Sequence, residues 1–144
     1  MIYYIADNHF GHKNVIRFDN RPFADTVLMD EVLVHNWNER VTEDDTVYIL
    51  GDCFWKNEEN SVKLIQRLKG HKHLIRGNHD RVHGRLRFYY ESIEHYAEIN
   101  DNDRLVILCH YPIPFYKNQH YGAVMLYGHV HNTREQDFIE KWKR

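Results

Sequence analysis

The chain has 144 residues, of which 42% are hydrophobic and 28% are charged, as expected of a globular protein with one domain spanning residues 1–144. Its net charge of −2 gives no indication of a nucleic-acid partner, and no apolar run approaches the ~18 residues of a membrane span, so we expect no membrane contact. Two cysteines, Cys53 and Cys109, exclude a disulfide framework and a paired-thiolate zinc site, and we expect a cytoplasmic protein.

The N-terminal third of the chain predicts a strand, a loop, a helix and a second strand. Residues 2–6 and 47–50 are short apolar runs rich in β-branched and aromatic side chains, a pattern typical of buried strands. Between them we expect a polar loop over residues 9–21 and then a helix whose N-cap is Asp25 or Thr26. The apolar stripe of this helix is expected to comprise Val27, Leu28, Val32, Val34 and Trp37.

The middle of the chain predicts a second helix over residues 58–68 and a third strand over residues 73–76. The inward residues of the helix are expected to be Val62, Leu64, Ile65 and Leu68, with Gly70 as its stop. Residues 81–92 give no clear element. Their first part, residues 81–87, is basic; it suits a second phosphate or a nucleic-acid backbone, or else forms a solvated charged face.

The C-terminal third predicts a β-hairpin over residues 95–109, with its turn at residues 101–103, and a last strand over residues 124–127. Residues 133–144 predict a short helix in which Thr133 and Gln136 form a capping box. Its apolar face comprises Phe138, Ile139 and Trp142, where a homodimer partner is one expectation. Strands that alternate with helices early and pair with each other later predict an α/β fold around a central pair of sheets.

Each of the five predicted strands stops at residues that can bind a metal. These residues are Asp7 and His9, Asp52, Asn78 to Asp80, His110, and His129 with His131. Because ligands in open α/β sheets bind outside the carboxyl ends of the strands, we expect one polynuclear metal site at that edge. Imidazole, carboxylate and amide donors favour Mn, Fe, Zn, Co or Ni over Ca. Two carboxylates against two dications leave a positive site, which favours an anionic substrate and a phosphoryl group above all.

These five blocks, in this order, resemble the motifs of the calcineurin-like metallophosphoesterase superfamily. They read Asp7-Asn8-His9, Gly51-Asp52, Gly77-Asn78-His79-Asp80, His110 and Gly128-His129-Val130-His131, and every ligand position of the family pattern is kept. The segments Phe10-Gly11-His12 and Asn20-Arg21-Pro22-Phe23 also look like those of small single-domain bacterial and phage members. The resemblance implies a compact four-layer α/β/β/α sandwich.

The resemblance also implies a role for each residue. One ion would be held by Asp7, His9, Asp52 and His131, and a second ion by Asp52, Asn78, His110 and His129. Of the two divalent ions per chain we expect Mn²⁺ first, with Fe, Zn, Ni or Co as alternatives. His79 would protonate the leaving oxygen or stabilise its charge, and Asp80 would orient the His79 ring. His12 and Arg21 either contact phosphate oxygens or fix the shape of the first loop.

These roles predict a phosphoesterase in which a metal-bridging hydroxide attacks phosphorus. A chain of this length leaves no room for a cap domain, so an open cleft and a phosphodiesterase acting on nucleotide-like or other small phosphodiesters are expected. A phosphomonoesterase or protein phosphatase is the alternative. A non-catalytic metal-binding interaction module is a third reading. A retromer subunit uses the same fold in that way and lacks the catalytic histidine, whereas His79 is present here.

Overall fold

Two β-sheets form the centre of the chain, and the computed structural model describes residues 1–82, 84–131 and 134–142. The first sheet consists of four parallel strands in the order β1 (Ile2–Ile5), β2 (Thr46–Ile49), β3 (His71–Ile75) and β4 (Ser92–Glu94). The first three strands follow predicted apolar runs. The fourth lies where no element was predicted, because its three residues carry no apolar run and only its pairing with β3 defines it.

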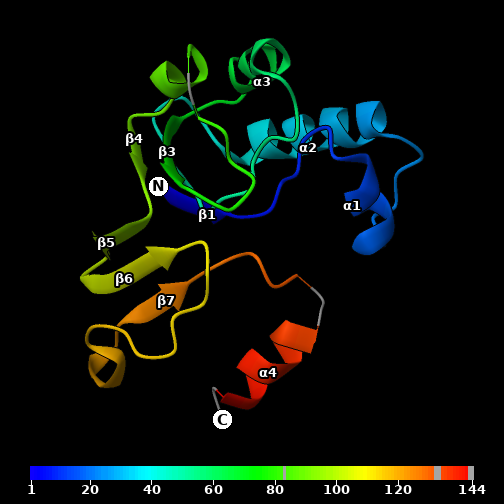
Figure 1. Cartoon of the computed structure of the whole chain (residues 1–144). Helices are drawn as coiled ribbons and strands as arrows, with labels where there is room; N and C mark the ends of the chain where they lie inside the picture. The colour runs from blue at the N-terminus through cyan, green and yellow to red at the C-terminus, as the bar shows by residue number, and fades with distance from the viewer. Residues whose placement is uncertain (83, 132–133, 143–144) are drawn as a thin grey trace.

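Helices cover one face of this sheet. α2 (Thr26–Arg40) joins β1 to β2 and α3 (Glu58–Ile65) joins β2 to β3, and both lie on the same side of the sheet in Figure 1. Asp25 caps α2 as predicted, since its carboxylate accepts a hydrogen bond from the backbone N–H of Leu28. The predicted inward residues of α3 are all buried, although the helix ends at Ile65, before the predicted boundary.

The buried face of α2 differs from the predicted stripe. Val27 and Leu28 are 71% and 47% exposed, whereas Met29, Val34 and Trp37 are buried. At 3.6 residues per turn, Leu28 lies roughly half a turn away from Trp37, on the opposite side of the helix. Val27 lies seven residues before Val34 and shares its side, but it stands in the first turn of the helix, where it stays exposed. The prediction for Val27 and Leu28 is therefore wrong.

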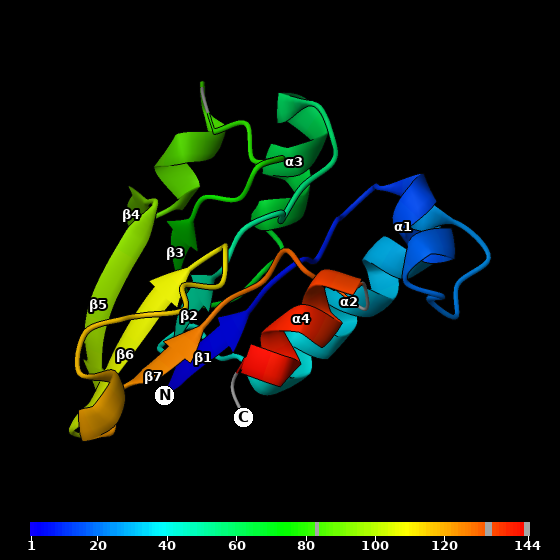
Figure 2. The same cartoon turned by 60° about the horizontal axis from the view of Figure 1, so that its bottom comes forward.

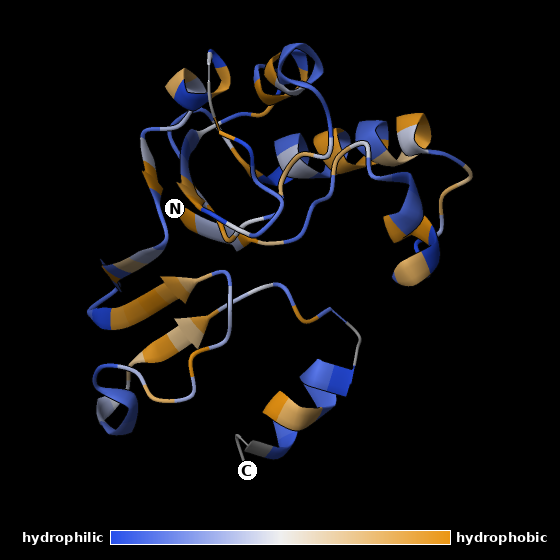
Figure 3. Cartoon of the chain, in the orientation of Figure 1, coloured by the Kyte–Doolittle hydropathy of each residue, from blue (hydrophilic) through white to orange (hydrophobic). Residues whose placement is uncertain are grey.

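The second sheet has three strands. β5 (Tyr96–Asp101) and β6 (Arg104–Cys109) form the predicted antiparallel hairpin, and β7 (Val124–Leu126) pairs with β6 in parallel. Asn102 and Asp103 both have positive φ, as a tight two-residue hairpin turn requires. Figure 3 shows that β6 is hydrophobic over most of its length, as expected of a strand whose central residues are buried.

The two sheets pack against each other through a small apolar core that includes Leu50, Ile75, Val106 and Leu108. A larger cluster fills the space between the first sheet and its helices. Figure 2 shows that the arrowheads of β1, β6 and β7 point toward the same end of the molecule. The chain thus has a mixed α/β fold that collects the carboxyl ends of strands from both sheets at one end.

Four further elements complete the described chain. α1 (Lys13–Phe18) occupies the segment predicted as a loop, and this expectation fails because the buried Val15 fixes a helical turn there. The 3₁₀-helices η1 (Leu86–Tyr89) and η2 (Gln119–Tyr121) precede β4 and β7. α4 (Arg134–Trp142) corresponds to the predicted C-terminal helix.

The apolar face predicted for α4 is only partly exposed. Phe138 is 61% exposed, whereas Ile139 lines a cavity of about 380 Å³ together with Met125 of β7. The predicted cap Thr133 and the side chain of Trp142 lie outside the described residues. Each helix that the structure describes is too short or too polar to cross a membrane.

Candidate metal centre

The residues predicted to bind metal converge where the strands end. Among the described residues, nine other than glycine have positive φ, and five of these are predicted ligands: Asp7, His9, Asp52, His129 and His131. Asp and His adopt this backbone conformation more readily than most residues, but it carries a cost and is concentrated at functional sites. The sharp backbone turns after β1, β2 and β7 direct these side chains to one place.

The first group consists of Asp7, His9 and His131, whose candidate ligand atoms all lie within 4.8 Å of one another. His131 Nε2 is 3.3 Å from His9 Nε2 and 3.4 Å from Asp7 Oδ1. Two atoms bound to the same ion at about 2.1 Å lie roughly 3.0–3.5 Å apart. The spacing therefore fits a shared metal ion.

The second group consists of Asp52, His110 and His129, again with ligand atoms within 4.8 Å of one another. His110 Nε2 is 3.4 Å from Asp52 Oδ2 and 3.1 Å from Asn78 Oδ1, so the predicted amide ligand lies beside the same ring nitrogen. Asp52 is 2% exposed and His110 is fully buried. All seven predicted ligands are thus brought together in the two predicted sets.

One carboxylate oxygen lies between the two groups. Asp52 Oδ2 is 3.8 Å from His9 Nε2 and 3.4 Å from His110 Nε2. Asp52 Oδ1 faces away from this point and accepts a hydrogen bond of 3.0 Å from the backbone N–H of His79. The arrangement suits the bridging role predicted for Asp52, with Oδ2 shared and Oδ1 held by the backbone.

Two of the histidines are held through Nδ1, which directs Nε2 into the centre. His131 Nδ1 donates to the Asp19 carboxylate at 2.8 Å, and His110 Nδ1 donates to the Leu50 carbonyl at 2.7 Å. Metal-binding histidines usually donate their second N–H in this way, which fixes the tautomer and the orientation of the ring. Asp19 was missed by sequence reasoning because it lies in the predicted loop, 112 residues from its partner.

The loop after β1 supports the third histidine. His9 Nδ1 and His12 Nδ1 are 3.1 Å apart, so with His9 Nε2 as ligand atom, its Nδ1–H donates to His12. Arg21 donates to the carbonyl oxygens of Asn8 and Asp7 at 2.8 and 2.7 Å. Of the two roles left open for His12 and Arg21, these contacts favour fixing the loop.

The carboxylates and imidazoles of the centre shift one another's pKa values. Burial raises the pKa of Asp7, but hydrogen bonds from His131 and His9 outweigh it and leave the pKa below its ordinary range. Burial also raises the pKa of Asp52, but the hydrogen bond from His110 outweighs it and leaves the pKa below its ordinary value. The hydrogen bond to Asp7 raises the pKa of His131 to about 9. The protonated ring of His131 therefore balances the charge of the Asp7 carboxylate beside it.

Asp80 has a different role from the predicted one. Its carboxylate accepts hydrogen bonds from the backbone N–H groups of Asp52, Cys53 and Gly77, at 2.8, 3.1 and 2.7 Å. The prediction that it orients the His79 ring is wrong, because the hydrogen bonds of its carboxylate go to these three amides and, among the described residues, none joins it to that ring. Asp80 instead ties the loop after β2 to the loop after β3, directly beneath Asp52.

The His79 ring has two other neighbours. The Asn78 side-chain amide lies 3.0 Å from His79 Nε2 and donates to it. The indole of Trp55 meets the ring edge-on, with centroids 4.4 Å apart, and stacks on His12 at 4.1 Å. Sequence reasoning missed Trp55, because nothing in the pattern marks an aromatic residue three positions after Asp52 as part of the site.

Glycine is required at the end of β2. Gly51 has a φ of +88°, and a Cβ there would lie 2.3 Å from His110 Nδ1. At the end of β3, a Cβ on Gly77 would lie 2.4 Å from Asp52 Oδ1. The glycines that precede the predicted ligands therefore leave room for ligands that arrive from neighbouring strands.

Comparison with known proteins gives relatives without a described activity, and no family model matches the chain. The gene 66 protein of Mycobacterium phage L5 is 38% identical over 85 residues, which cover 56% of this chain and 40% of the phage protein. The solved structure of AQ665, a protein of unknown function from Aquifex aeolicus, matches with a TM-score of 0.66 and 32% identity, over 78% of this chain and 61% of that chain. The chain thus spans less than two thirds of the Aquifex protein.

The match to a third relative extends over nearly the whole chain. The uncharacterized protein MJ1445 of Methanocaldococcus jannaschii is 35% identical over 139 residues, which cover 95% of this chain and 73% of that protein. The chain belongs to the same protein family as MJ1445.

Proposed function

We propose that the protein is a dinuclear metal-dependent phosphoesterase of the calcineurin-like metallophosphoesterase type. The observation that carries the proposal is the position of Asp52 Oδ2, 3.8 Å from His9 Nε2 and 3.4 Å from His110 Nε2. A carboxylate oxygen between two groups of nitrogen and oxygen donors is what a pair of ions that share one bridging ligand needs. The proposal includes the finer fold assignment, a four-layer α/β/β/α sandwich, and a cytoplasmic location.

The donor set fits two divalent transition-metal ions. Imidazole nitrogens, carboxylate oxygens and one amide oxygen suit Mn²⁺, our first choice, and also Fe, Zn, Ni or Co, whereas Ca²⁺ prefers oxygen donors alone. Three of the histidines already direct Nε2 inward through their Nδ1 contacts. Bound ions would lower the pKa of a bound water, so that it can attack phosphorus as hydroxide. Their positive charge would stabilise the phosphoryl oxygens.

His79 has the position expected of the proton donor. Its ring lies beside Asn78 at the exposed side of the centre, and its backbone N–H is fixed by Asp52. Because Nε2 accepts a hydrogen bond from the Asn78 amide, the neutral ring carries its N–H on Nδ1, which can donate a hydrogen bond that stabilises charge on a leaving oxygen. To protonate that oxygen, the ring must first take up a second proton at Nε2. The presence of this ring beside the ligands favours an enzyme over a passive metal-binding module.

We propose phosphodiesters as substrates, including nucleotide-like or other small diesters. A cavity of about 370 Å³ opens beside Asn78 and His79 and provides space for a substituent on the phosphate. The leaving group of a phosphomonoester would fit the same space, so monoester hydrolysis is the alternative to be separated by experiment.

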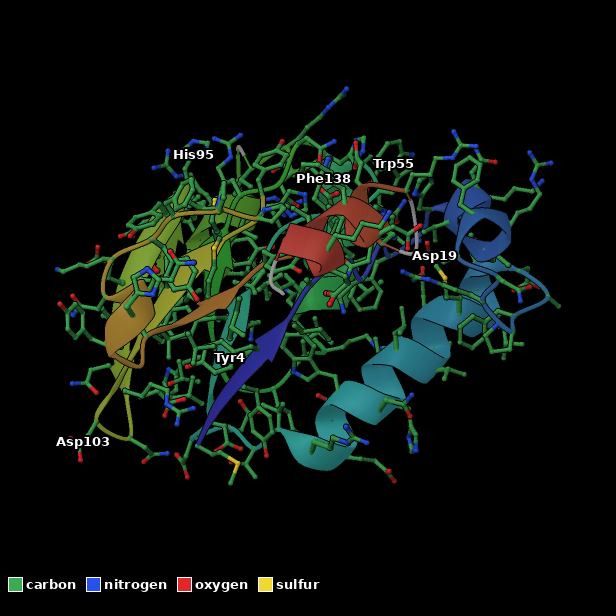
Figure 4. The ribbon with its side chains drawn as sticks, turned by 90° about the horizontal axis from the view of Figure 1, so that it is seen from below. Tyr4, Asp19, Trp55, His95, Asp103 and Phe138 are labelled. Carbon is green, nitrogen blue, oxygen red and sulfur yellow. The ribbon has the colours of Figure 1, made fainter. Side chains whose placement is uncertain are left out.

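The first test measures metal content together with hydrolysis of a chromogenic phosphodiester and its matching monoester, with added Mn²⁺, Ni²⁺, Zn²⁺ or Mg²⁺. We expect two bound ions per chain and faster diester turnover. In the same assays, His79→Asn should keep both ions and lose roughly 10²–10⁴ in rate. His95→Ala, in an exposed histidine that Figure 4 labels, is the control and should leave metal content and rate unchanged. A chain that binds both ions and hydrolyses neither ester would refute the proposal.

A further inference from the structure

The cavity next to the metal centre is lined in part by aromatic and apolar side chains. It adjoins His79 and is lined by Trp55, Tyr90 and Leu86, with Lys56 and Arg81 among its polar residues. Tyr90 and Leu86 are buried core residues, whereas Trp55 is 43% exposed. The cavity therefore offers the partly exposed indole of Trp55 to a ligand, directly beside the proposed proton donor.

Backbone hydrogen bonds hold Trp55 in place. Its N–H donates to the Phe10 carbonyl at 2.7 Å, and Phe10 in turn donates to the Cys53 carbonyl at 2.9 Å. Asp30 of α2 joins the same two loops, since it accepts a hydrogen bond from Gly11 N at 2.8 Å and pairs with Lys56 at 3.0 Å. The indole thus stands on two connected loops, at the end of the molecule toward which the β1 arrow points (Figure 4).

From this geometry we infer that the cavity is the subsite for the leaving group of the substrate, and that Trp55 selects leaving groups with a planar aromatic ring. The inference rests on the proposed function, in which His79 protonates the leaving oxygen. The leaving group must then lie on the His79 side of the phosphorus, and the cavity is the space there. A ring that enters it meets the exposed part of the indole, and aromatic pairs add attraction beyond their buried area.

Charge in the cavity favours an uncharged ring over a second phosphate. The ammonium group of Lys56 is neutralised by Asp30, 3.0 Å away. The carboxylate of Asp80, which also lines the cavity, is occupied by backbone N–H groups. Arg81 remains as an exposed cation that can contact a polar substituent on the ring.

The test uses two diesters that share a methyl group and differ in the leaving alcohol: phenyl methyl phosphate and a fluoroalkyl methyl phosphate of matched leaving-group acidity. The metal-loaded protein should prefer the phenyl ester in kcat/KM. Trp55→Ala should reduce that preference roughly five- to tenfold, and Trp55→Phe should retain most of it. Competitive inhibition by 2-naphthol, which involves no chemical step, should weaken in Trp55→Ala. Phe88→Ala is the matched control, because Phe88 is 80% exposed and lies outside the cavity.

The outcomes separate this inference from the proposed function. Equal loss on both esters in Trp55→Ala, with the preference unchanged, would make Trp55 a support for the His79 ring and would overturn the subsite. Hydrolysis of both esters without any preference would overturn it as well, while the phosphoesterase proposal stands. Metal binding without hydrolysis of either ester would refute the proposed function itself, and the subsite with it.

Discussion

The two halves of the metal centre are built in different ways. In the group of Asp7, His9 and His131, the backbone N–H of His129 donates to Asp7, but both histidine rings are held by side chains from the loop and helix after β1, His12 and Asp19. The second group is supported mainly by backbone atoms. There, the Leu50 carbonyl holds His110, and the backbone N–H of His79 holds Asp52.

Burial follows this division only in part. Asp52 and His110 are 2% and 0% exposed, but His9 of the first group is buried as well, at 4%, and His129 of the second group is partly exposed, as Asp7 and His131 are. A site fixed by the backbone between two sheets is preorganised as soon as the sheets form, while a site fixed by side chains depends on a short helix and a loop. The difference indicates that the second group sets the position of the centre and the first group is the more easily changed.

The largest effect is expected from the residue that belongs to both groups. Asp52→Asn removes the charge of the bridging oxygen, so both ions should be lost together, and with them the stabilisation that bound metal gives the folded chain. Metal content after dialysis and thermal unfolding with and without Mn²⁺ measure this. Asp103→Asn, in the distant hairpin turn (Figure 4), is the matched control. Loss of one ion alone would argue against the bridging assignment.

A smaller effect is expected from the support beneath the second group. Asp80→Asn replaces a carboxylate that accepts three backbone hydrogen bonds by an amide whose NH₂ group cannot accept them. The free energy of unfolding of the metal-free chain should fall by about 1–3 kcal/mol. Chemical denaturation measures the change, again against Asp103→Asn. If stability is unchanged while only turnover on diesters falls, Asp80 acts on His79 after all.

The same division explains what the sequence could and could not predict. The ligands follow apolar runs, and each is fixed to a strand end by its neighbours in the chain, so Asp52 and His110 were visible in the pattern. Asp19 and Trp55 act through contacts between segments that are separated in the sequence, and no repeating residue pattern links those segments. Asp80 was correctly placed in the site but assigned to the wrong partner, because adjacency to His79 in sequence does not determine where a carboxylate points.

Sequence analysis also misplaced part of the buried face of α2 and did not predict β4, for a related reason. Val27 and Leu28 are apolar, yet the sheet lies against the face that contains Met29 and Trp37. β4 is a strand through pairing with β3 rather than through its composition. In both cases tertiary packing decided between local alternatives that the sequence leaves nearly equal.

The side-chain support of the first group should affect one ion only. Asp19→Asn keeps an acceptor for His131 Nδ1 but removes the charge, and the affinity of the first ion should fall about 10–100-fold while the second ion stays bound. Titration with Mn²⁺ resolves the two binding steps. Asp25→Asn is a suitable control, since this N-cap of α2 tolerates Asn. Equal weakening of both ions would show that the two groups are not supported independently.

A further effect is a dependence on pH that should have opposite signs in the stability of the metal-free chain and in its affinity for the first ion. The hydrogen bond to Asp7 raises the pKa of His131 to about 9 from an ordinary value of 6.5. Because the folded pKa is the higher one, this pair stabilises the metal-free chain fully below pH 6.5, and the contribution is lost as the pH rises through about 9.

Metal binding needs the neutral imidazole, so over the same range the affinity of the first ion should rise, by up to about tenfold per pH unit. Thermal unfolding of chelator-treated protein and Mn²⁺ titration at several pH values measure both slopes, and His131→Gln should flatten both. The ion pair between His131 and Asp7 would be contradicted by one result. In that result the free energy of unfolding of the metal-free chain rises between pH 6.5 and 9, and His131→Gln leaves this pH dependence unchanged. Asp7 and His131 would then lie apart in the metal-free chain. The first group would be less preorganised, relative to the backbone-supported group, than the distances between its ligand atoms indicate.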